Sequence, residues 1–351
     1  MRKLALLIGV VCVALGALAG GGSATPAVGT PVMVGLHNPR GLAFDHRGNL
    51  YVAEAGLGGT SPCAAFSDGL TRCYGPTGSV SRLRRGVQEY VATGLPSNAP
   101  EGFGGAAALG PHDLSFEEGN KAYLTIGLGA NPTDPTIAPF RALGMGYLAR
   151  IHPDTRDGDH WRLETDIAAY EAANNPDGNV PDSDPFGILN RDGRRVVTDA
   201  GGNDLLEVHG RHVSLLAVFP SRPGRSTDSV PTTVARGPDG AYYVGELTGG
   251  PFTPDIARVY RVAHGTATPY GPTWSWIIDI AWGPDGHLYV LEFGHPPDGT
   301  GSTLYRLESD GSKTPVVTGL QAAGGFVFGR HGSIYISNHS TSPAGEVLQF
   351  P

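Results

Sequence analysis

Short segments in which hydrophobic and polar residues alternate recur along the chain, and each is interrupted by a turn rich in Gly, Asp or Asn. The clearest pair is TVARGPDGAYYVGE at 233–246 and DIAWGPDGHLYVLE at 279–292. Alternation with a period of two residues across such a turn predicts a β-hairpin. Pro and Gly at the second and fourth positions of Gly-Pro-Asp-Gly suit a type I turn. Each copy therefore predicts two strands joined by a tight turn.

Six copies of this hairpin align on the second strand, at Tyr51, Tyr123, Val196, Tyr243, Tyr289 and Tyr335. The last three steps are 47, 46 and 46 residues, and the first two are longer, at 72 and 73 residues, because they contain insertions. A third alternating segment follows most copies, and a fourth is visible in several, such as QEYVATGL at 88–95. Four strands in roughly 40–50 residues is the pattern of a β-propeller blade.

The pattern thus predicts an all-β chain folded as a six-bladed β-propeller. The sixth copy has only three strands before the chain stops, whereas PVMVGL at 31–36 matches PVVTGL, the fourth-strand segment at 315–320. We therefore expect the N-terminal strand to complete the last blade, which would remove an exposed sheet edge. Residues 20–351 are expected to form a single propeller domain.

The first 19 residues predict a signal peptide: Arg2 and Lys3 precede an apolar run that ends in Ala-Leu-Ala. The run is too short for a membrane anchor, so the mature protein is expected to be secreted. Cleavage would leave 23 of the 25 basic residues against 33 acidic ones. Nucleic-acid binding needs the opposite balance and is not expected.

Cleavage would also remove Cys12 and leave Cys63 and Cys73. In an oxidising compartment, two cysteines so close in sequence most simply form a local disulfide. Two free thiols or a metal-binding pair are the alternatives.

Several motifs resemble known families. Pro-Arg-Gly-Leu-Ala at 39–43, followed by GNLYVAE at 48–54, is similar to NHL-type repeats. The segments LTIGLGANP, DIAAYEAANNPDG, TDAGGNDLLEV and GELTGGPFTPDIARVYRV together resemble secreted bacterial proteins of the ScyD/ScyE type, named for a cyanobacterial sunscreen-pigment gene cluster. This resemblance covers nearly all of the mature chain. It implies a six-bladed propeller and brings no particular activity.

The long insertions point to one functional face. With strands A to D running outward from the axis, the B–C and D–A connections lie at the same end of the ring. The insertions at 56–77, 96–111, 127–145 and 174–184 all fall in such connections. Long loops on one face of a rigid scaffold are typical of a binding surface; random variation in loop length is the alternative.

Hydrogen-bonding side chains recur at the end of strand B on this face: Glu54, Asp199, Glu246, Glu292 and Asn338, with Ile126 as the exception. They are candidates to cap the following turn by accepting backbone N–H groups. Contact with a ligand, or with a hard cation such as Ca²⁺, is the alternative role.

The start of strand A supplies Arg40, His112, Asp113 and Asp279. Asp113 and Asp279 are three blades apart, so we expect them to face each other across the axis, with His112 beside one of them. Similar positions in six-bladed lactonases and gluconolactonase-like hydrolases hold a divalent ion that polarises a carbonyl or activates water. Polar residues that hold water in the channel are the alternative.

These observations favour a secreted binding or interaction module that uses the long-loop face. Its expected partner is a small molecule, a glycan or another exported protein, with or without a divalent cation. The alternative is a metal-dependent hydrolase of the lactonase or gluconolactonase type, and a third reading is a scaffold without a ligand. The sequence leaves enzymatic activity open.

Overall fold

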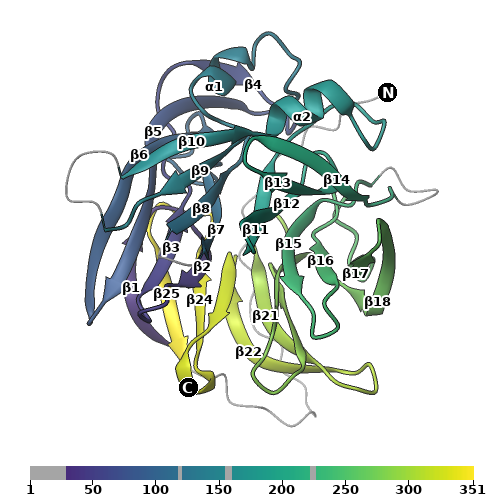
Figure 1. Ribbon diagram of the computed structural model, residues 1–351. Coiled ribbons are helices and arrows are strands. Elements are labelled where there is room, and N and C mark those ends of the chain that lie inside the picture. Colours follow the sequence, from purple (N-terminus) through teal and green to yellow (C-terminus); the bar gives the residue numbers. More distant parts are fainter. Residues whose placement is uncertain (1–28, 118–120, 155–159, 222–226) are drawn as a thin grey trace, which may run out of the picture.

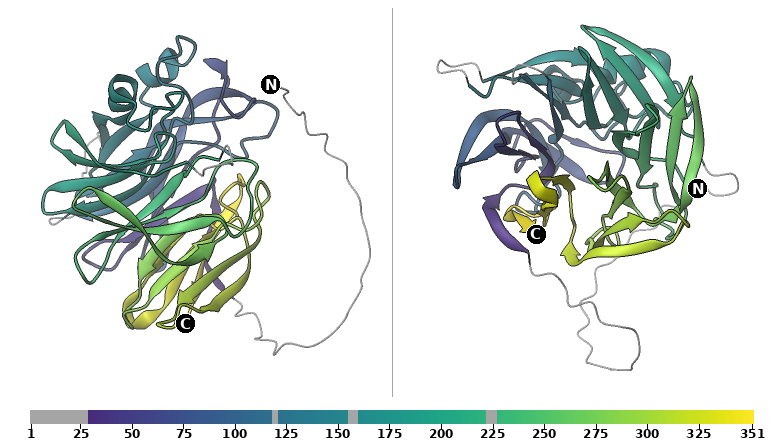
Figure 2. Two further views of the ribbon diagram at one scale, coloured as in Figure 1. Left: turned by 90° about the vertical axis from the view of Figure 1, so that its right-hand side faces the viewer. Right: turned by 60° about the horizontal axis from the view of Figure 1, so that its bottom comes forward.

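A computed structural model describes residues 29–117, 121–154, 160–221 and 227–351. The predicted signal peptide and Cys12 lie outside the described residues. Six antiparallel sheets are arranged around a central axis, as the right-hand view of Figure 2 shows. The chain is a six-bladed β-propeller, as the hairpin repeat predicts.

The first three blades contain the insertions. Blade 1 is built from β2 (Pro39–Phe44), β3 (Leu50–Glu54), β5 (Thr71–Arg84) and β6 (Val87–Pro100), with the short β4 (Cys63–Ala65) paired to β5. Blade 2 contains β7 (Pro111–Glu117), β8 (Lys121–Ile126), β9 (Tyr147–Ile151) and β10 (Trp161–Asp166). Blade 3 contains β11 (Pro185–Arg191), β12 (Arg194–Asp199), β13 (Asp204–His209) and β14 (His212–Val218).

The last three blades are more regular. Blade 4 contains β15 (Pro231–Arg236), β16 (Tyr242–Glu246), β17 (Ala257–Ala263) and β18 (Thr266–Trp274). Blade 5 contains β19 (Ile277–Trp282), β20 (Leu288–Glu292), β21 (Thr300–Leu307) and β22 (Lys313–Gln321). Blade 6 contains β23 (Gly325–Phe328), a short 3-10 helix (Arg330–Gly332) in its A–B turn, β24 (Ile334–Asn338), β25 (Gly345–Phe350) and, from the other end of the chain, β1 (Thr30–Leu36).

The predicted closure of the ring by the N-terminal strand is confirmed. β1 pairs with β25 in antiparallel register, with Met33 opposite Val347 (Figure 1). Met33 is 1% exposed and Leu36 is fully buried, whereas Val34 between them is 59% exposed. One face of the strand therefore packs into the core, as alternation along a strand requires.

The insertions gather at one end of the ring. They include β4 and two helices, α1 (Ala138–Ala142) and α2 (Ile167–Asn174), which lie together at the top of Figure 1. α2 begins after Asp166, whose side chain accepts a hydrogen bond from the N–H of Ala169, and ends at Asn175 in the left-handed conformation. No helix among the described residues is both long and apolar enough to span a membrane.

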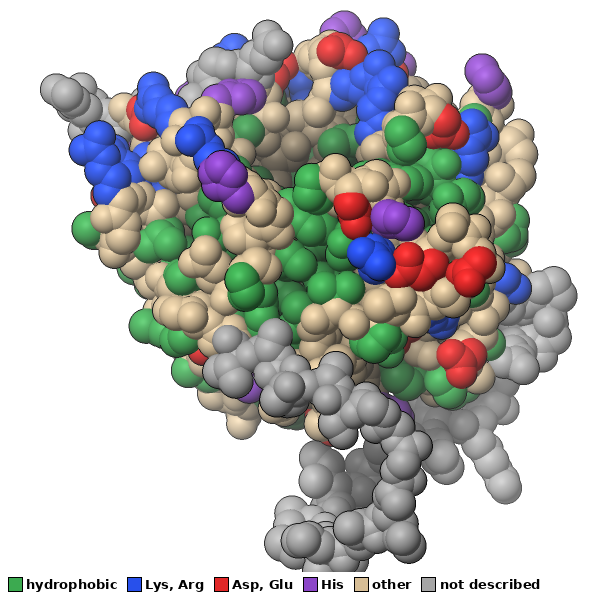
Figure 3. Space-filling model, turned by 90° about the horizontal axis from the view of Figure 1, so that it is seen from below, with side chains coloured by type: hydrophobic (Ala, Val, Ile, Leu, Met, Phe, Trp, Pro, Cys, Tyr) green, Lys and Arg blue, Asp and Glu red, His purple; other side chains and the backbone are tan. Residues whose placement is uncertain are grey.

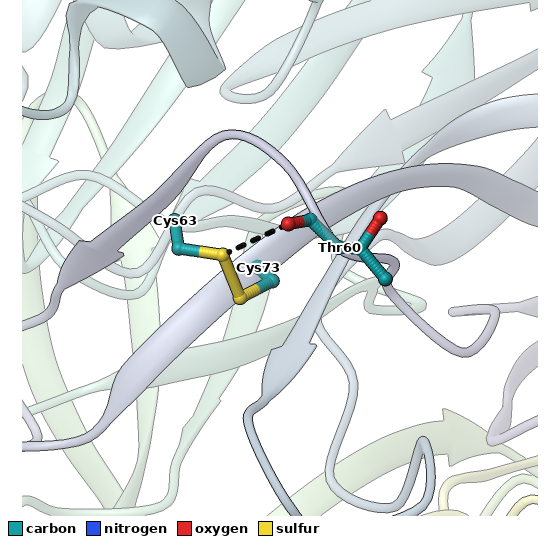
Figure 4. Close-up of a disulfide and its surroundings, with 3 residues drawn as sticks. All are labelled: Thr60, Cys63 and Cys73. Carbon is teal, nitrogen blue, oxygen red and sulfur yellow. Dashed lines mark hydrogen bonds between the residues drawn. A yellow bond between two sulfur atoms is a disulfide. The ribbon is translucent and has the colours of Figure 1, made fainter.

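Two connections of blade 1 differ from the expected loops. β5 begins at Thr71 and β6 continues to Pro100, so parts of the segments predicted as insertions at 56–77 and 96–111 are strand. Cys63 and Cys73 lie opposite each other in the β4–β5 ladder and form a disulfide (Figure 4). The disulfide confirms the expected pairing and holds β4 against β5.

A Tyr–Arg pair recurs between strands B and C. Tyr51 pairs with Arg82, Tyr243 with Arg261 and Tyr289 with Arg306. In each of these blades an Asp of the A–B turn also accepts a hydrogen bond from the Tyr hydroxyl, at 3.3, 3.4 and 3.0 Å; these are Asp45, Asp239 and Asp285. The three side chains clamp the turn to the sheet. We call this set the Asp–Tyr–Arg clamp.

Candidate functional site

The hydrogen-bonding side chains at the end of strand B hold the D–A connections. Glu54 accepts the backbone N–H of His37 at 2.7 Å, Glu292 that of Ser275 at 2.8 Å, and Asn338 that of Gln321 at 2.9 Å. Each donor lies 17 residues before its acceptor. The bonded segment is thus the connection that enters the blade, rather than the turn that follows strand B.

Two further members of this set make related contacts. Glu246 accepts a hydrogen bond from the hydroxyl of Ser229, also 17 residues earlier, at 2.5 Å. Asp199 accepts from the hydroxyl of Ser183 and from three backbone N–H groups, those of Asp184, Gly201 and Gly202. These contacts give the side chains a structural role, and for Asp199 the Gly201 and Gly202 donors lie in the turn that follows strand B, as predicted.

Asp113 and Asp279 link innermost strands of adjacent blades. Asp113 accepts the N–H groups of Leu114 and, in the next blade, of Ile188 at 3.0 Å. Asp279 accepts the N–H of Phe326 in the next blade at 2.9 Å and the hydroxyl of Thr233 in the preceding blade at 2.8 Å. Each carboxylate is therefore hydrogen-bonded to the backbone of the next blade.

The two aspartates lie close enough to interact across the axis. Burial raises the pKa of Asp113 well above its ordinary value, and the charge of Asp279 raises it further. Burial likewise raises the pKa of Asp279 to about 6, against the opposing effect of its hydrogen bonds. The packing is tight here, because a Cβ on Gly41 would lie 2.1 Å from Oδ1 of Asp113.

Arg40, His112 and Asp184 form a separate polar group at the loop-side end of the axis. Arg40 is 7% exposed and donates to the carbonyl of Ala108 at 2.9 Å. Nδ1 of His112 lies 3.9 Å from Oδ1 of Asp184, and the imidazole stacks against Phe186 with ring centroids 4.3 Å apart. We call these three polar residues the axial trio.

Burial controls the charges of the axial trio. Desolvation lowers the pKa of His112 well below its ordinary value, with the charge of Arg40 acting in the same direction. Desolvation, together with the charges of Asp199 and Asp182, raises the pKa of Asp184 to about 8. The pKa of Arg40 falls with burial only to about 10. At neutral pH the trio is thus one cation beside two mostly neutral groups.

A cluster of buried and half-buried carboxyls lies next to Asp184, where α2 and the following loop meet blade 3. Its members are Glu171, Asp182, Asp199 and Asp204. Desolvation and mutual repulsion raise the pKa of Glu171 to about 8 and that of Asp182 to about 7. No group of three or more His, Cys, Asp or Glu side chains within the described ranges is arranged to hold a metal ion.

Four clefts of about 300–540 Å³ lie between consecutive blades. Residues of the A–B or C–D turns line each of them, at the end of the ring opposite the insertions. Seen from below Figure 1, hydrophobic side chains gather in the middle of the view and most charged ones lie toward its edge (Figure 3). These clefts lie on the face opposite the one on which the long loops predict a functional surface.

Sequence reasoning identified Asp199 but missed Asp184 and the other three carboxyls around it. The acid-rich segment NPDGNVPDSDP at 175–185 carries two of these acids. Its composition alone does not show that Asp182 and Asp184 turn inward, toward Asp199 of strand β12. That arrangement depends on how α2 positions the loop against blade 3.

Comparison with known proteins identifies the architecture. No protein-family model matches the chain, and no curated protein matches it in sequence. A solved structure provisionally assigned as an oxidoreductase (glucose dehydrogenase) from Thermus thermophilus is 15% identical, with a TM-score of 0.56, over 93% of this chain and 100% of its own.

Two other solved structures are similar to the same extent. The α-L-arabinanase of Penicillium chrysogenum, complexed with arabinobiose, is 12% identical over 93% of this chain and 98% of its own, with a TM-score of 0.54. A protein provisionally assigned as a gluconolactonase is 12% identical over 93% of each chain, with a TM-score of 0.53. At these identities the likeness shows the fold alone.

Proposed function

We propose that this protein is an exported ligand-binding β-propeller whose site lies over the axial trio, on the long-loop face. The observation that supports this is the state of Arg40: its Nε has no hydrogen-bond partner among the described residues, although it is buried. Buried polar atoms nearly always have a partner. A bound ligand would supply the missing acceptor once the side chains that cover the Nε have moved aside.

The charge of the axial trio favours a ligand with an anionic group. Arg40 stays protonated at neutral pH. His112 is uncharged, and Asp184 is in its neutral, protonated form in most molecules. A carboxylate placed against Arg40 would gain a charge-assisted hydrogen bond in a site of low dielectric constant. The half-buried Phe186 offers an apolar surface beside it.

A metal-dependent hydrolase of the lactonase type has less support. The carboxylates of Asp113 and Asp279 already accept backbone N–H groups, from Leu114 in the same strand and from Ile188 and Phe326 in the next blades, which leaves them poorly placed to share a metal ion. Export, NHL-type repeats and membership of the ScyD/ScyE-type proteins form part of the proposal. The signal-peptide pattern, the quoted motifs and the disulfide support them.

A thermal-shift screen tests the proposed site. Small mono- and dicarboxylates, each paired with its uncharged amide, should include at least one carboxylate that raises the melting temperature by mass action. Arg40→Gln should abolish that rise, and Arg47→Gln, at an exposed position on the opposite face, should preserve it. A rise that survives Arg40→Gln would contradict the axial site. A rise with Ca²⁺ and none with any carboxylate would favour the hydrolase.

A further inference from the structure

The sixth blade departs from the Asp–Tyr–Arg clamp. Tyr335 occupies the Tyr position of strand B, but its cross-strand partner is Gln349 where blades 1, 4 and 5 have Arg. His331 stands four residues before Tyr335, where blades 4 and 5 have Asp. The two groups that hold the Tyr hydroxyl elsewhere are therefore replaced.

This departure occurs at the largest of the four described clefts, of about 540 Å³, between blade 6 and blade 1. Two phenylalanines, Phe44 and Phe328, line it together with Tyr335, Gln349, Ser333 and Arg330. The ring of Phe44 meets that of Tyr335 edge to face, with centroids 5.3 Å apart. Cleft volumes of this order are typical of small-molecule sites.

Three polar side chains of this cleft make no polar side-chain contact. Throughout the described part of the chain, the solvent-accessible Tyr335 hydroxyl, Gln349 amide and Arg330 guanidinium have no hydrogen-bond or ion-pair partner in the protein. The cleft between blades 3 and 4 provides the contrast, because Arg261 there lies 2.6 Å from Asp239 and is paired. Comparison with the other blades thus shows that the unpaired polar side chains are a particular feature of blade 6.

We infer that the cleft between blades 6 and 1 binds an acidic sugar of the hexuronate class. A pyranose ring needs apolar contacts and several hydroxyl partners, which the rings of Phe44 and Phe328 and the polar groups of Tyr335 and Gln349 offer. Arg330 adds an unpaired cation at the rim, which suits the carboxylate of a hexuronate. This site lies on the opposite face from the axial trio and is independent of it.

Calorimetric titration of the full mature chain tests this inference, with D-galacturonate, its linear trimer and D-galactose as probes. Galacturonate and the trimer should bind, and galactose should bind more weakly by roughly tenfold or more, since it lacks the charge-assisted contact. Arg330→Gln should remove that preference. Arg330 is exposed, so the substitution is not expected to disturb folding.

A second variant restores the repeat. His331→Asp combined with Gln349→Arg should rebuild the clamp around Tyr335 and lower hexuronate affinity by roughly tenfold or more. Tyr289→Phe, which removes the same hydroxyl from the paired set in blade 5, should leave affinity unchanged. Absence of galacturonate binding, or equal affinity in the rebuilt variant, would overturn the inference. Loss of binding in Arg40→Gln and not in Arg330→Gln would assign the sugar to the axial site instead.

Discussion

Single carboxylates connect one blade to the next near the axis. Asp279 is bonded on both sides, to Thr233 in blade 4 and to the N–H of Phe326 in blade 6, and is a residue of the innermost strand of blade 5. Removing its side chain leaves a buried backbone donor without an acceptor, which costs more than the bond itself contributes. The contact is local but ties three blades together.

Asp279→Ala is therefore expected to lower the free energy of unfolding by roughly 2–3 kcal/mol. Asp279→Asn retains one acceptor oxygen and should cost less. Glu101→Ala, at an exposed position, should change stability by less than about 0.5 kcal/mol. Chemical denaturation of the three variants measures the differences. Equal stability of Asp279→Ala and Glu101→Ala would show that the hydrogen bonds of Asp279 contribute little to the free energy of unfolding.

The carboxyl cluster near Asp184 makes stability depend on pH. The folded-state pKa values of Glu171 and Asp184 are raised to about 8 and that of Asp182 to about 7, against roughly 4 in an unfolded chain. The folded protein thus holds protons that the unfolded chain releases. This contribution to stability is complete below pH 4 and is lost as the pH rises through 7 and 8.

Three kinds of group face this cluster. Other acids, Asp177 and Asp228, repel its charges. Ser67 donates to Asp182, and the backbone N–H of Asp182 interacts with Glu171. Arg40, from blade 1, attracts Asp184.

The melting temperature should therefore fall between pH 5 and pH 8.5. Glu171→Gln, which mimics the protonated acid, should raise it at pH 8.5 and leave it unchanged at pH 5. Glu101→Gln should follow the native profile. Scanning calorimetry at the two pH values makes the comparison. An identical decline in Glu171→Gln and the native chain would show that Glu171 does not titrate in this range.

At the scale of elements, strand patterns predicted the hairpins well, because alternation and turn residues are local signals. The Gly-Pro-Asp-Gly turn forms as expected, with Gly237 donating to Ala241 and Gly240 at a φ of +81°. α1 was not predicted, since five residues with a Pro give little periodic signal. The length of β5 and β6 also escaped prediction, because the glycines and prolines along them favour loops.

The candidate sites were only partly accessible from sequence. Arg40 and His112 were identified by their place at the start of strand A, but their partner Asp184 comes from a loop positioned by α2. The 17-residue spacing between Glu54 and His37, or Glu292 and Ser275, is a regularity visible only once the donors are known. The cleft beside Tyr335 depends on which residues face each other across strands, which the repeat alignment alone does not give.

The disulfide acts on one element. Cys63 and Cys73 are separated by 10 residues, and Sγ of Cys63 lies 3.3 Å from the carbonyl oxygen of Thr60 in the same loop (Figure 4). Replacing both cysteines by Ser should lower the free energy of unfolding by about 2–3 kcal/mol on the chain-entropy model. The far-ultraviolet circular dichroism spectrum should not change. Limited proteolysis should cut the variant faster near β4. Loss of the β spectrum would instead assign the disulfide a role in the whole fold.

At the scale of the whole molecule, the ring depends on a strand from the opposite end of the chain. β1 covers the edge of β25, and its residues Met33 and Leu36 pack with Val52 and Val347 between blades 6 and 1. Without it the sheet of blade 6 would expose an unpaired edge and apolar side chains, which favours aggregation. The covalent order of the chain thus differs from the spatial order of its strands, as a closed ring requires.

Met33→Asp should prevent stable closure, because a buried charge without a partner would replace an apolar side chain that is 1% exposed. Val34→Asp, one residue along on the 59% exposed face of the same strand, is the matched control and should leave the fold intact. Gel filtration and thermal unfolding distinguish the two: Met33→Asp should aggregate or melt far below the native chain. A milder variant, Met33→Ala, should fold with a loss of about 2–5 kcal/mol. If Met33→Asp and Val34→Asp behaved alike, packing of β1 would not be needed to close the ring. Closure would then have to come from contacts between blades 6 and 1 alone.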